Sequence, residues 1–203
     1  MSDFNFEIKT LAKQSLIYGI SSAIGRLLSL ISAPILTRIF NTSEYGIISL
    51  VQIALGLAVI FAGLNIGSGV TYYYFYYDDN KLKKNVLSSG FVTIVSLGFL
   101  IASALFLFAD QINSIFNFKT NNEEKINVIP FLRIGAFSVF FGIIMTAMQS
   151  ILRIKQEPKK YAIVEFVCLI SSFVFTLVLV INFKLGIKGV FLATVFGTLL
   201  GML

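Results

Sequence analysis

The sequence predicts an all-α integral membrane protein, and three observations support this fold class. The 203-residue chain is 57% hydrophobic and only 13% charged, whereas a soluble domain carries about 25% charged residues. Its mean hydropathy is +0.87. Its apolar residues are grouped in segments of about 20 residues, the length that a helix needs to cross about 30 Å of hydrocarbon. We therefore expect a bundle of six transmembrane helices over residues 15–203.

The six expected spans alternate with shorter polar segments. They cover residues 15–37, 46–70, 86–109, 128–152, 161–183 and 187–203. Residues 1–14 precede them and are expected to form a cytoplasmic tail, in which Phe4, Phe6, Ile8 and Leu11 alternate with polar residues. This pattern favours a short amphipathic helix on the membrane surface, and a frayed tail is the alternative.

The first span carries two residues that are unusual in a membrane helix. Arg26 lies about ten residues, or about 15 Å, from either end, too far for its guanidinium to reach the interface fully. A charge at that depth costs about 2.5–3.5 kcal/mol on insertion scales, so we expect Arg26 to contact an anionic substrate or, alternatively, to pair with Glu165. Pro34 removes an amide donor and presses on the carbonyl of Leu30, which predicts a kink that serves as a hinge or remains a static bend.

The second and third spans flank the segment TYYYFYYDDNKLKK, residues 71–84. Its tyrosines are typical of the aromatic belt at a membrane interface, and its lysines of a cytoplasmic loop. We therefore expect this segment to contact membrane lipids. A platform on which sugars stack is the alternative.

The last three spans contain the remaining candidate residues. Arg133 lies a few residues inside the outer end of the fourth span, where it either reaches the outer headgroups or lines an outward-facing cavity. Glu165 is the only acid inside a span and is the candidate for proton or cation coupling. GTLLG, Gly197–Gly201, fits the small-xxx-small pattern of close helix packing. The sixth span ends without a polar flank, so we expect a chain truncated before a second bundle.

The distribution of basic residues predicts the orientation, because cytoplasmic loops are enriched in Lys and Arg. One side of the membrane receives nine of them: Lys9, Lys13, Lys81, Lys83, Lys84, Arg153, Lys155, Lys159 and Lys160. The other side receives five: Arg38, Lys119, Lys125, Lys184 and Lys188. The N-terminus is therefore predicted to be cytoplasmic.

The sequence lacks the residues that several classes of chemistry require. The chain has one cysteine, Cys168, and no histidine, so it has neither a disulfide framework nor a zinc site or a histidine general base. Asp78 and Asp79 are adjacent but isolated, whereas an integral-membrane enzyme needs clustered catalytic groups or a metal site at one membrane face. We therefore expect no enzymatic activity, no cofactor, no metal and no nucleic-acid partner.

The first third of the chain resembles a known family. LAKQSLIYGISSAIGRLLSLISAPILTRIFNTSEYGIISLVQIALGLAVIFAGLNIGSGVTYYYF, residues 11–75, is similar to the N-terminus of Wzx-type O-antigen and capsule repeat-unit flippases of the MATE-like MOP superfamily. The resemblance rests on the N-terminal tail, the proline and Thr-Arg pair ending the first span, the NTSEYG turn and the glycine-rich second span. It implies that the six spans form the N-terminal bundle of a two-bundle transporter in the bacterial cytoplasmic membrane.

The resemblance also implies a substrate, an isoprenoid diphosphate that carries an oligosaccharide repeat unit. Arg26, and more weakly Arg133, would contact the diphosphate in a central cavity alternately open to each side. The implied partners are a missing C-terminal bundle or a second copy, together with polysaccharide polymerase and glycosyltransferases. Two other functions stay open: a drug or cation antiporter, in which Glu165 would be the coupling carboxylate, and a non-transporting scaffold for polysaccharide assembly.

Overall fold

The computed structural model describes residues 2–63, 66–116 and 127–203, and every regular element in these ranges is a helix. The elements in chain order are α1 (Ser2–Ile39), α2 (Thr42–Gly63), α3 (Ile66–Tyr76), α4 (Asn80–Leu107), α5 (Ala109–Phe116), α6 (Ile129–Ile154), α7 (Pro158–Leu177), the π-helical turn η1 (Val178–Asn182) and α8 (Ile187–Met202). The predicted all-α membrane fold is confirmed.

Five helical segments of the described chain are long and apolar enough to cross a membrane. They are Leu16–Ile39, Thr42–Tyr76, Asn80–Leu107, Ile129–Ile154 and Pro158–Asn182. The sixth predicted span, 187–203, corresponds to α8, a shorter apolar helix of 16 residues. The protein is thus a multi-pass membrane protein, and the count of six spans stays a prediction.

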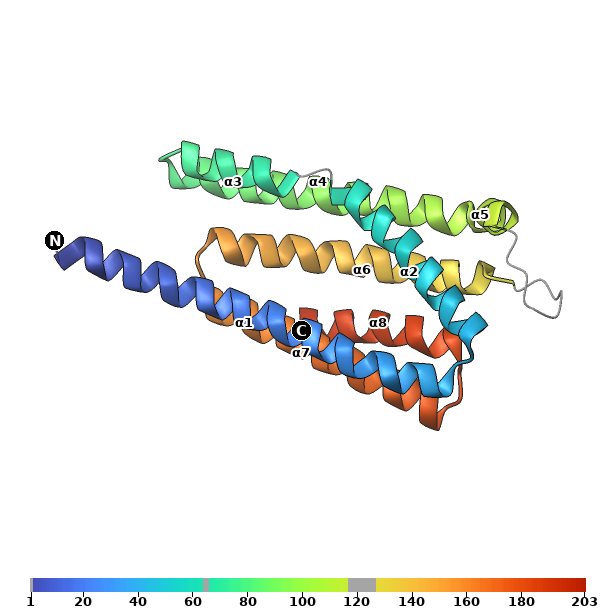
Figure 1. Cartoon of the computed structure of the whole chain (residues 1–203). Coiled ribbons are helices and arrows are strands. Elements are labelled where there is room, and N and C mark those ends of the chain that lie inside the picture. Colours follow the sequence, from blue (N-terminus) through green and yellow to red (C-terminus); the bar gives the residue numbers. More distant parts are fainter. Residues whose placement is uncertain (1, 64–65, 117–126) are drawn as a thin grey trace.

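The second predicted span, 46–70, corresponds to two helices. α2 crosses the bundle diagonally from the end of α1, whereas α3 lies beside α4 and reaches Tyr76 (Figure 1). Hydropathy detects the length of an apolar segment but not a change in its direction, so the sequence indicated one element here.

The connections between helices gather at the two ends of the bundle. The N-terminus, the α3–α4 connection and the α6–α7 connection lie at one end, and the α1–α2 and α7–α8 connections lie at the other (Figure 1). The predicted alternation of loops between two sides is therefore present. We refer to the end that holds the N-terminus as the N-terminal end and to the opposite one as the far end.

α6 forms the centre of the bundle, between α3 and α4 on one side and α1, α7 and α8 on the other (Figure 1). Val139 and Ile143 of α6 pack with Val51 and Leu55 of α2 and with Phe191 of α8 in one hydrophobic cluster. Glycines let the helices approach closely. A Cβ at Gly135 would meet the side chain of Leu55 at 2.5 Å.

α1 packs mainly against α7 and covers its outer side. Ser21 is 1% exposed, Tyr18 meets the ring of Tyr161 edge to face at 5.0 Å, and a Cβ at Gly25 would contact Leu169 at 3.3 Å. The helix continues through Pro34, which is exposed, and the hinge expected there stays a prediction. Because α1 begins at Ser2, the backbone of the predicted tail belongs to the same helix, and the side chains of 1–15 lie outside the described ones.

α7 and α8 are in the closest contact of the bundle. A Cβ at Gly197 would lie 1.9 Å from Ser172 Oγ and 2.7 Å from its Cα, and a Cβ at Gly201 would lie 2.8 Å from Cys168 Cβ. Ser172 and Cys168 are four residues apart and share one face of α7. The close packing predicted for the GTLLG segment is therefore confirmed.

Candidate functional site

A polar pocket of about 440 Å³ lies between the α2–α3 segment and α6. Its lining comprises Gly63, Gly67, Ser68, Thr71, Phe75, Ile94, Thr146, Ala147, Ser150, Arg153 and Ile154. Gly63 has no neighbour within 4 Å of a built Cβ, and Gly67 meets only Ser150 Oγ at 3.8 Å, so these two glycines leave space between the helices. The volume falls within the range of about 300–1,000 Å³ typical of ligand pockets.

Three hydroxyl groups in the pocket lining, those of Thr71, Thr146 and Ser150, can accept hydrogen bonds from a ligand. Thr71 donates to the carbonyl of Gly67, Thr146 to that of Gly142 and Ser150 to that of Thr146, each at 2.8 Å. A hydroxyl has one hydrogen to donate and two lone pairs. Since each hydrogen is used within its own helix, the remaining capacity of these three groups is to accept hydrogen bonds.

Arg153 supplies the positive charge of the pocket lining. Its Cζ lies 5.4 Å from the ring centroid of Tyr161, and Tyr161 in turn is buried against Tyr18. Cation–π contacts of this kind contribute about 0.5–2 kcal/mol and fix the orientation of the guanidinium. No carboxylate of the described residues pairs with Arg153, so its N–H donors remain available for an anion.

The N-terminal end around Arg153 is positively charged. Lys155, Lys159 and Lys160 follow it in sequence, with Glu157 as the neighbouring acid. A hydrogen bond from Lys160, 2.8 Å away, together with the charges of Lys160 and Lys155, holds the pKa of Glu157 below its usual value. The surplus of cations raises the local concentration of anionic ligands.

Arg26 is exposed on α1, directly after the Gly25 contact with α7. Its side chain forms no hydrogen bond or ion pair with a described residue. The alternative, an ion pair with Glu165, is not formed, and Glu165 of α7 instead accepts a hydrogen bond from Gln149 Nε2 of α6. Within the described chain, Arg26 is therefore an unpaired charge at mid-span, and its contact with an anionic substrate stays a prediction.

A stripe of small and polar side chains continues from Arg26 toward the far end of α1. Ser29, Ala33 and Thr37 follow at three, seven and eleven residues, a spacing that places them on one helical face. Tyr18 contacts Tyr161, which in turn contacts Arg153, so these three residues lie at a similar depth along the bundle. Arg26 follows Tyr18 by eight residues, or about 12 Å of helical rise. The two guanidinium groups are thus at successive depths.

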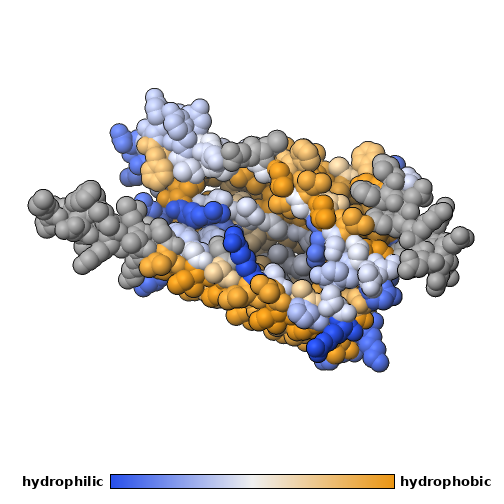
Figure 2. Space-filling model, viewed as in Figure 1, coloured by the Kyte–Doolittle hydropathy of each residue, from blue (hydrophilic) through white to orange (hydrophobic). Residues whose placement is uncertain are grey.

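The space-filling view places this surface beside a hollow. Figure 2 shows a depression in the middle of the face that α1 crosses, with hydrophilic side chains at its edges over α1 and over the adjoining end of α6. Orange, hydrophobic side chains cover the outer surface of the α1–α7 layer around it.

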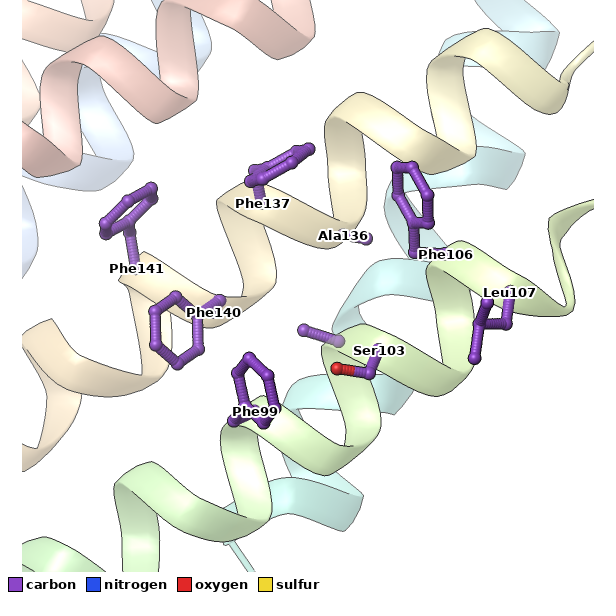
Figure 3. Close-up of a pocket in the computed structure, with 9 residues that line it drawn as sticks. Phe99, Ser103, Phe106, Leu107, Ala136, Phe137, Phe140 and Phe141 are labelled. Atoms are coloured by element: carbon purple, nitrogen blue, oxygen red, sulfur yellow. The ribbon is translucent and has the colours of Figure 1, made fainter.

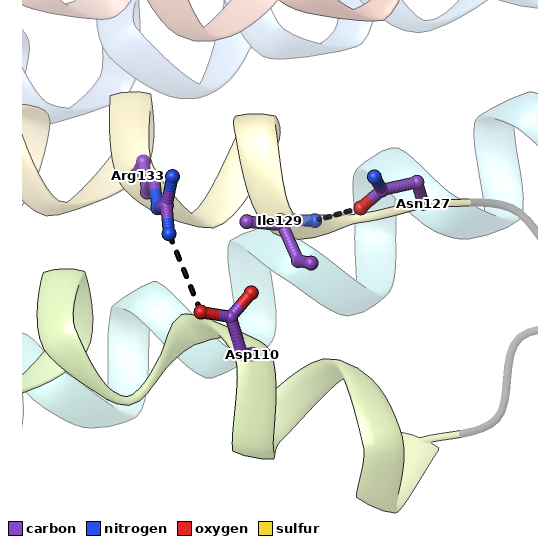
Figure 4. A network of polar contacts seen from close by, with 4 residues as sticks. All are labelled: Asp110, Asn127, Ile129 and Arg133. Atoms are coloured by element: carbon purple, nitrogen blue, oxygen red, sulfur yellow. Dashed lines mark hydrogen bonds and ion pairs between the residues drawn. The ribbon is translucent and has the colours of Figure 1, made fainter.

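Arg133 lies elsewhere, at the far end of α6. It is 20 residues from Arg153 on the same helix, or about 30 Å of helical rise. Arg133 Nη2 pairs with Asp110 Oδ2 of α5 at 3.3 Å (Figure 4), and its Cζ lies 5.4 Å from the ring centroid of Phe106. The structure therefore does not bring Arg133 to the polar pocket.

Sequence reasoning missed two of these features, and each left a signal. Thr146, Ser150 and Arg153 recur at four and seven residues, the spacing of one helical face, which could have placed Arg153 on a polar wall instead of in a loop. Asp110 directly follows the third predicted span, on the side of the membrane where Arg133 enters the fourth. That shared side could have suggested their pairing.

Comparison with known proteins gives one match. A protein-family model described as "Polysaccharide biosynthesis protein" matches residues 11–203, nearly the whole chain. Neither the search of curated proteins nor the search of solved structures gives a match.

Proposed function

We propose that this chain, which belongs to the polysaccharide biosynthesis protein family, is a flippase. In this proposal it moves isoprenoid-diphosphate-linked oligosaccharide repeat units across the bacterial cytoplasmic membrane by alternating access. The observation that carries it is Arg153, a guanidinium without a carboxylate partner among the described residues, fixed in the wall of a pocket that also presents hydroxyl acceptors. Guanidinium matches the paired oxygens of a phosphate, and hydroxyl acceptors match the donors of a sugar.

The physical problem of flipping supports this assignment. The free-energy cost of moving a diphosphate and sugars through hydrocarbon is prohibitively high. The headgroup therefore needs a polar path, while the isoprenoid tail stays in lipid. Arg153 would receive the diphosphate at the N-terminal end, which is cytoplasmic in this proposal. Arg26 would take it at mid-depth, where transporters of two rocking bundles bind their substrates. The second bundle would be a further part of the protein or a second copy.

Complementation tests the proposal directly. The full-length protein, expressed with the matching repeat-unit pathway in a bacterium that lacks its own flippase, is expected to restore surface polysaccharide. Purified protein in vesicles is expected to expose a lipid-linked oligosaccharide on the opposite leaflet. Absence of both activities, with the protein present in the membrane, would contradict the flippase assignment and favour a scaffold.

Arg153→Gln is expected to lower vesicle translocation about tenfold, because a charge-assisted hydrogen bond contributes about 1.5–3 kcal/mol. The apparent KM for the lipid-linked substrate is expected to rise more than kcat falls, since the pocket acts in loading. Lys159→Gln removes a charge from the same end without touching the pocket and is the matched control. Equal translocation by the two variants would exclude a role for the pocket.

Glu165→Gln tests the coupling role. The amide can still accept the hydrogen bond from Gln149, so the variant is expected to reach the membrane at the wild-type level. If Glu165 carries the coupling proton, transport by the variant becomes independent of an imposed pH gradient. An unchanged gradient response would assign Glu165 a purely structural contact between α6 and α7.

A further inference from the structure

An apolar groove of about 450 Å³ runs between α4 and α6. Phenylalanine side chains from both helices stand along it, as seen in Figure 3. Its lining comprises Phe99, Ala102, Ser103, Phe106, Leu107, Ala136, Phe137, Phe140 and Phe141. Among the lining atoms, apolar surface greatly exceeds polar surface, in contrast with the pocket beside Arg153.

Two aromatic pairs and a floor of small residues create this groove. Phe99 meets Phe140 edge to face at 5.9 Å, and Phe106 meets Phe137 in the same way at 6.0 Å. On α4 the two phenylalanines are seven residues apart, about 10.5 Å, whereas on α6 they are three residues apart, about 4.5 Å. The two aromatic pairs are therefore farther apart on α4 than on α6. The small side chains of Ala102, Ser103 and Ala136 lie between the pairs and do not fill the space.

The groove lies at the depth of the far-end half of the membrane. From Phe99 to the end of α4 at Leu107 the rise is about 12 Å, close to the thickness of about 15 Å of one hydrocarbon leaflet. Its walls are open to the surroundings, since Phe99 is 60% and Leu107 is 70% exposed. The surroundings of these walls in a membrane are lipid chains.

A pair of opposite charges stands where the groove reaches the far end. Arg133 contacts both Phe106, a wall residue of the groove, and Asp110. The ion pair has one 3.3 Å contact, and the side chains are 45% and 58% exposed. Among the described residues, the other N–H groups of Arg133 and the second carboxylate oxygen of Asp110 have no further partner, so they can bind a ligand.

We propose that the groove and this ion pair form a binding site for a zwitterionic phospholipid that carries a primary ammonium. One acyl chain lies in the phenylalanine-lined groove, the phosphate accepts hydrogen bonds from Arg133, and the ammonium donates to Asp110. The order of groups in the lipid, chain then phosphate then ammonium, matches the succession of contacts from the groove wall at Phe106 to Arg133 and from Arg133 to Asp110. The site is about 30 Å along α6 from Arg153 and is independent of the flippase assignment.

Charge complementarity selects this headgroup over the alternatives. A lipid with a phosphate but no ammonium leaves Asp110 facing a second negative charge, and like charges at close range are unfavourable. A trimethylated ammonium keeps the charge but has no N–H to donate to Asp110. The expected order of affinity is ethanolamine, then choline, then glycerol headgroups.

Native mass spectrometry of the purified full-length protein tests the proposal. The protein is titrated with phosphatidylethanolamine, phosphatidylcholine or phosphatidylglycerol of identical acyl chains. The first bound ethanolamine lipid is expected to bind about tenfold more tightly than the glycerol lipid, and both Arg133→Gln and Asp110→Asn are expected to abolish this preference. Lys188→Gln, which removes an exposed cation from the same end, is expected to preserve it.

A second variant tests the groove separately from the charges. Ser103→Phe places a large side chain between the two aromatic pairs and is expected to weaken binding of all three lipids while leaving the Arg133–Asp110 contact in place. Equal affinity for the three headgroups in the wild type, or an ethanolamine preference that survives Arg133→Gln, would overturn the proposal. Displacement of bound lipid by an isoprenoid diphosphate alone, without headgroup preference, would assign the groove to the transported substrate's tail instead.

Discussion

Arg26→Ala is expected to reduce export of lipid-linked repeat units by at least about tenfold, the largest functional effect of any single substitution in this bundle. The reason is its position: the guanidinium stands at mid-span on an exposed face of α1, without a described hydrogen-bond or ionic partner. A loss of one charge-assisted contact of about 1.5–3 kcal/mol corresponds to about 10- to 150-fold. The measurement is surface polysaccharide in a flippase-deficient strain, normalised to the membrane level of the variant.

The membrane level itself is expected to stay constant or rise. Insertion of a charge at this depth costs about 2.5–3.5 kcal/mol, which alanine removes, and the Arg26 side chain is exposed. Arg26→Lys keeps the positive charge but removes the planar guanidinium, which can donate two parallel hydrogen bonds. If this variant retains most of the export, the positive charge alone accounts for the role of Arg26. Lys188→Ala serves as the matched control. Full export by Arg26→Ala would contradict the diphosphate contact.

Gly197→Ala is expected to destabilise the bundle by about 1–3 kcal/mol, the largest structural effect of adding a single methyl group. The added Cβ meets Ser172 Oγ at 1.9 Å and the Ser172 Cα at 2.7 Å. The hydroxyl can rotate away, but the backbone atom cannot, so α8 must move off α7. Overpacking of this kind costs about 1–3 kcal/mol, or a fall in Tm of about 2–12 °C in a chain of this length, measurable on the purified protein in detergent.

Gly142→Ala provides the comparison, because a Cβ at Gly142 has nothing within 4 Å. It is expected to be neutral or to stabilise α6 by up to about 1 kcal/mol through its higher helix propensity. Adding Ser172→Gly to Gly197→Ala removes the obstructing side chain and is expected to restore part of the loss. An unchanged Tm in Gly197→Ala would mean that the α7–α8 contact is looser than described.

Much of the fold was predictable because transfer into lipid is a property of composition. The length of the apolar segments predicted the positions of five spans. The spacing of Gly197 and Gly201 predicted a close helix contact, and the structure shows that its partner is α7. The depth of Arg26 followed from counting residues within one helix. These are all local quantities, which a single sequence contains.

The remaining features depend on which helices are neighbours, which hydropathy does not encode. Glu165 meets Gln149 instead of Arg26, and Arg133 pairs with Asp110 of α5, because α6 lies between α4 and α7. Arg153 looked like a loop charge, yet it belongs to the last turn of α6 and to the wall of a pocket. For a residue at the end of a helix, the sequence alone does not show whether its side chain belongs to a loop or to a binding site.

The pairing of α1 with α7 also has a consequence for biogenesis. Gly25 and its contact Leu169 are separated by most of the chain, and synthesis at about 5–20 residues per second puts roughly 7–30 s between them. During that interval the ribosome has delivered a helix with a mid-span arginine whose packing partner does not yet exist. A nascent α1 must therefore be sheltered by the insertion machinery or wait at its lateral gate, and slowing translation between α2 and α6 is expected to prolong its crosslinking to that machinery.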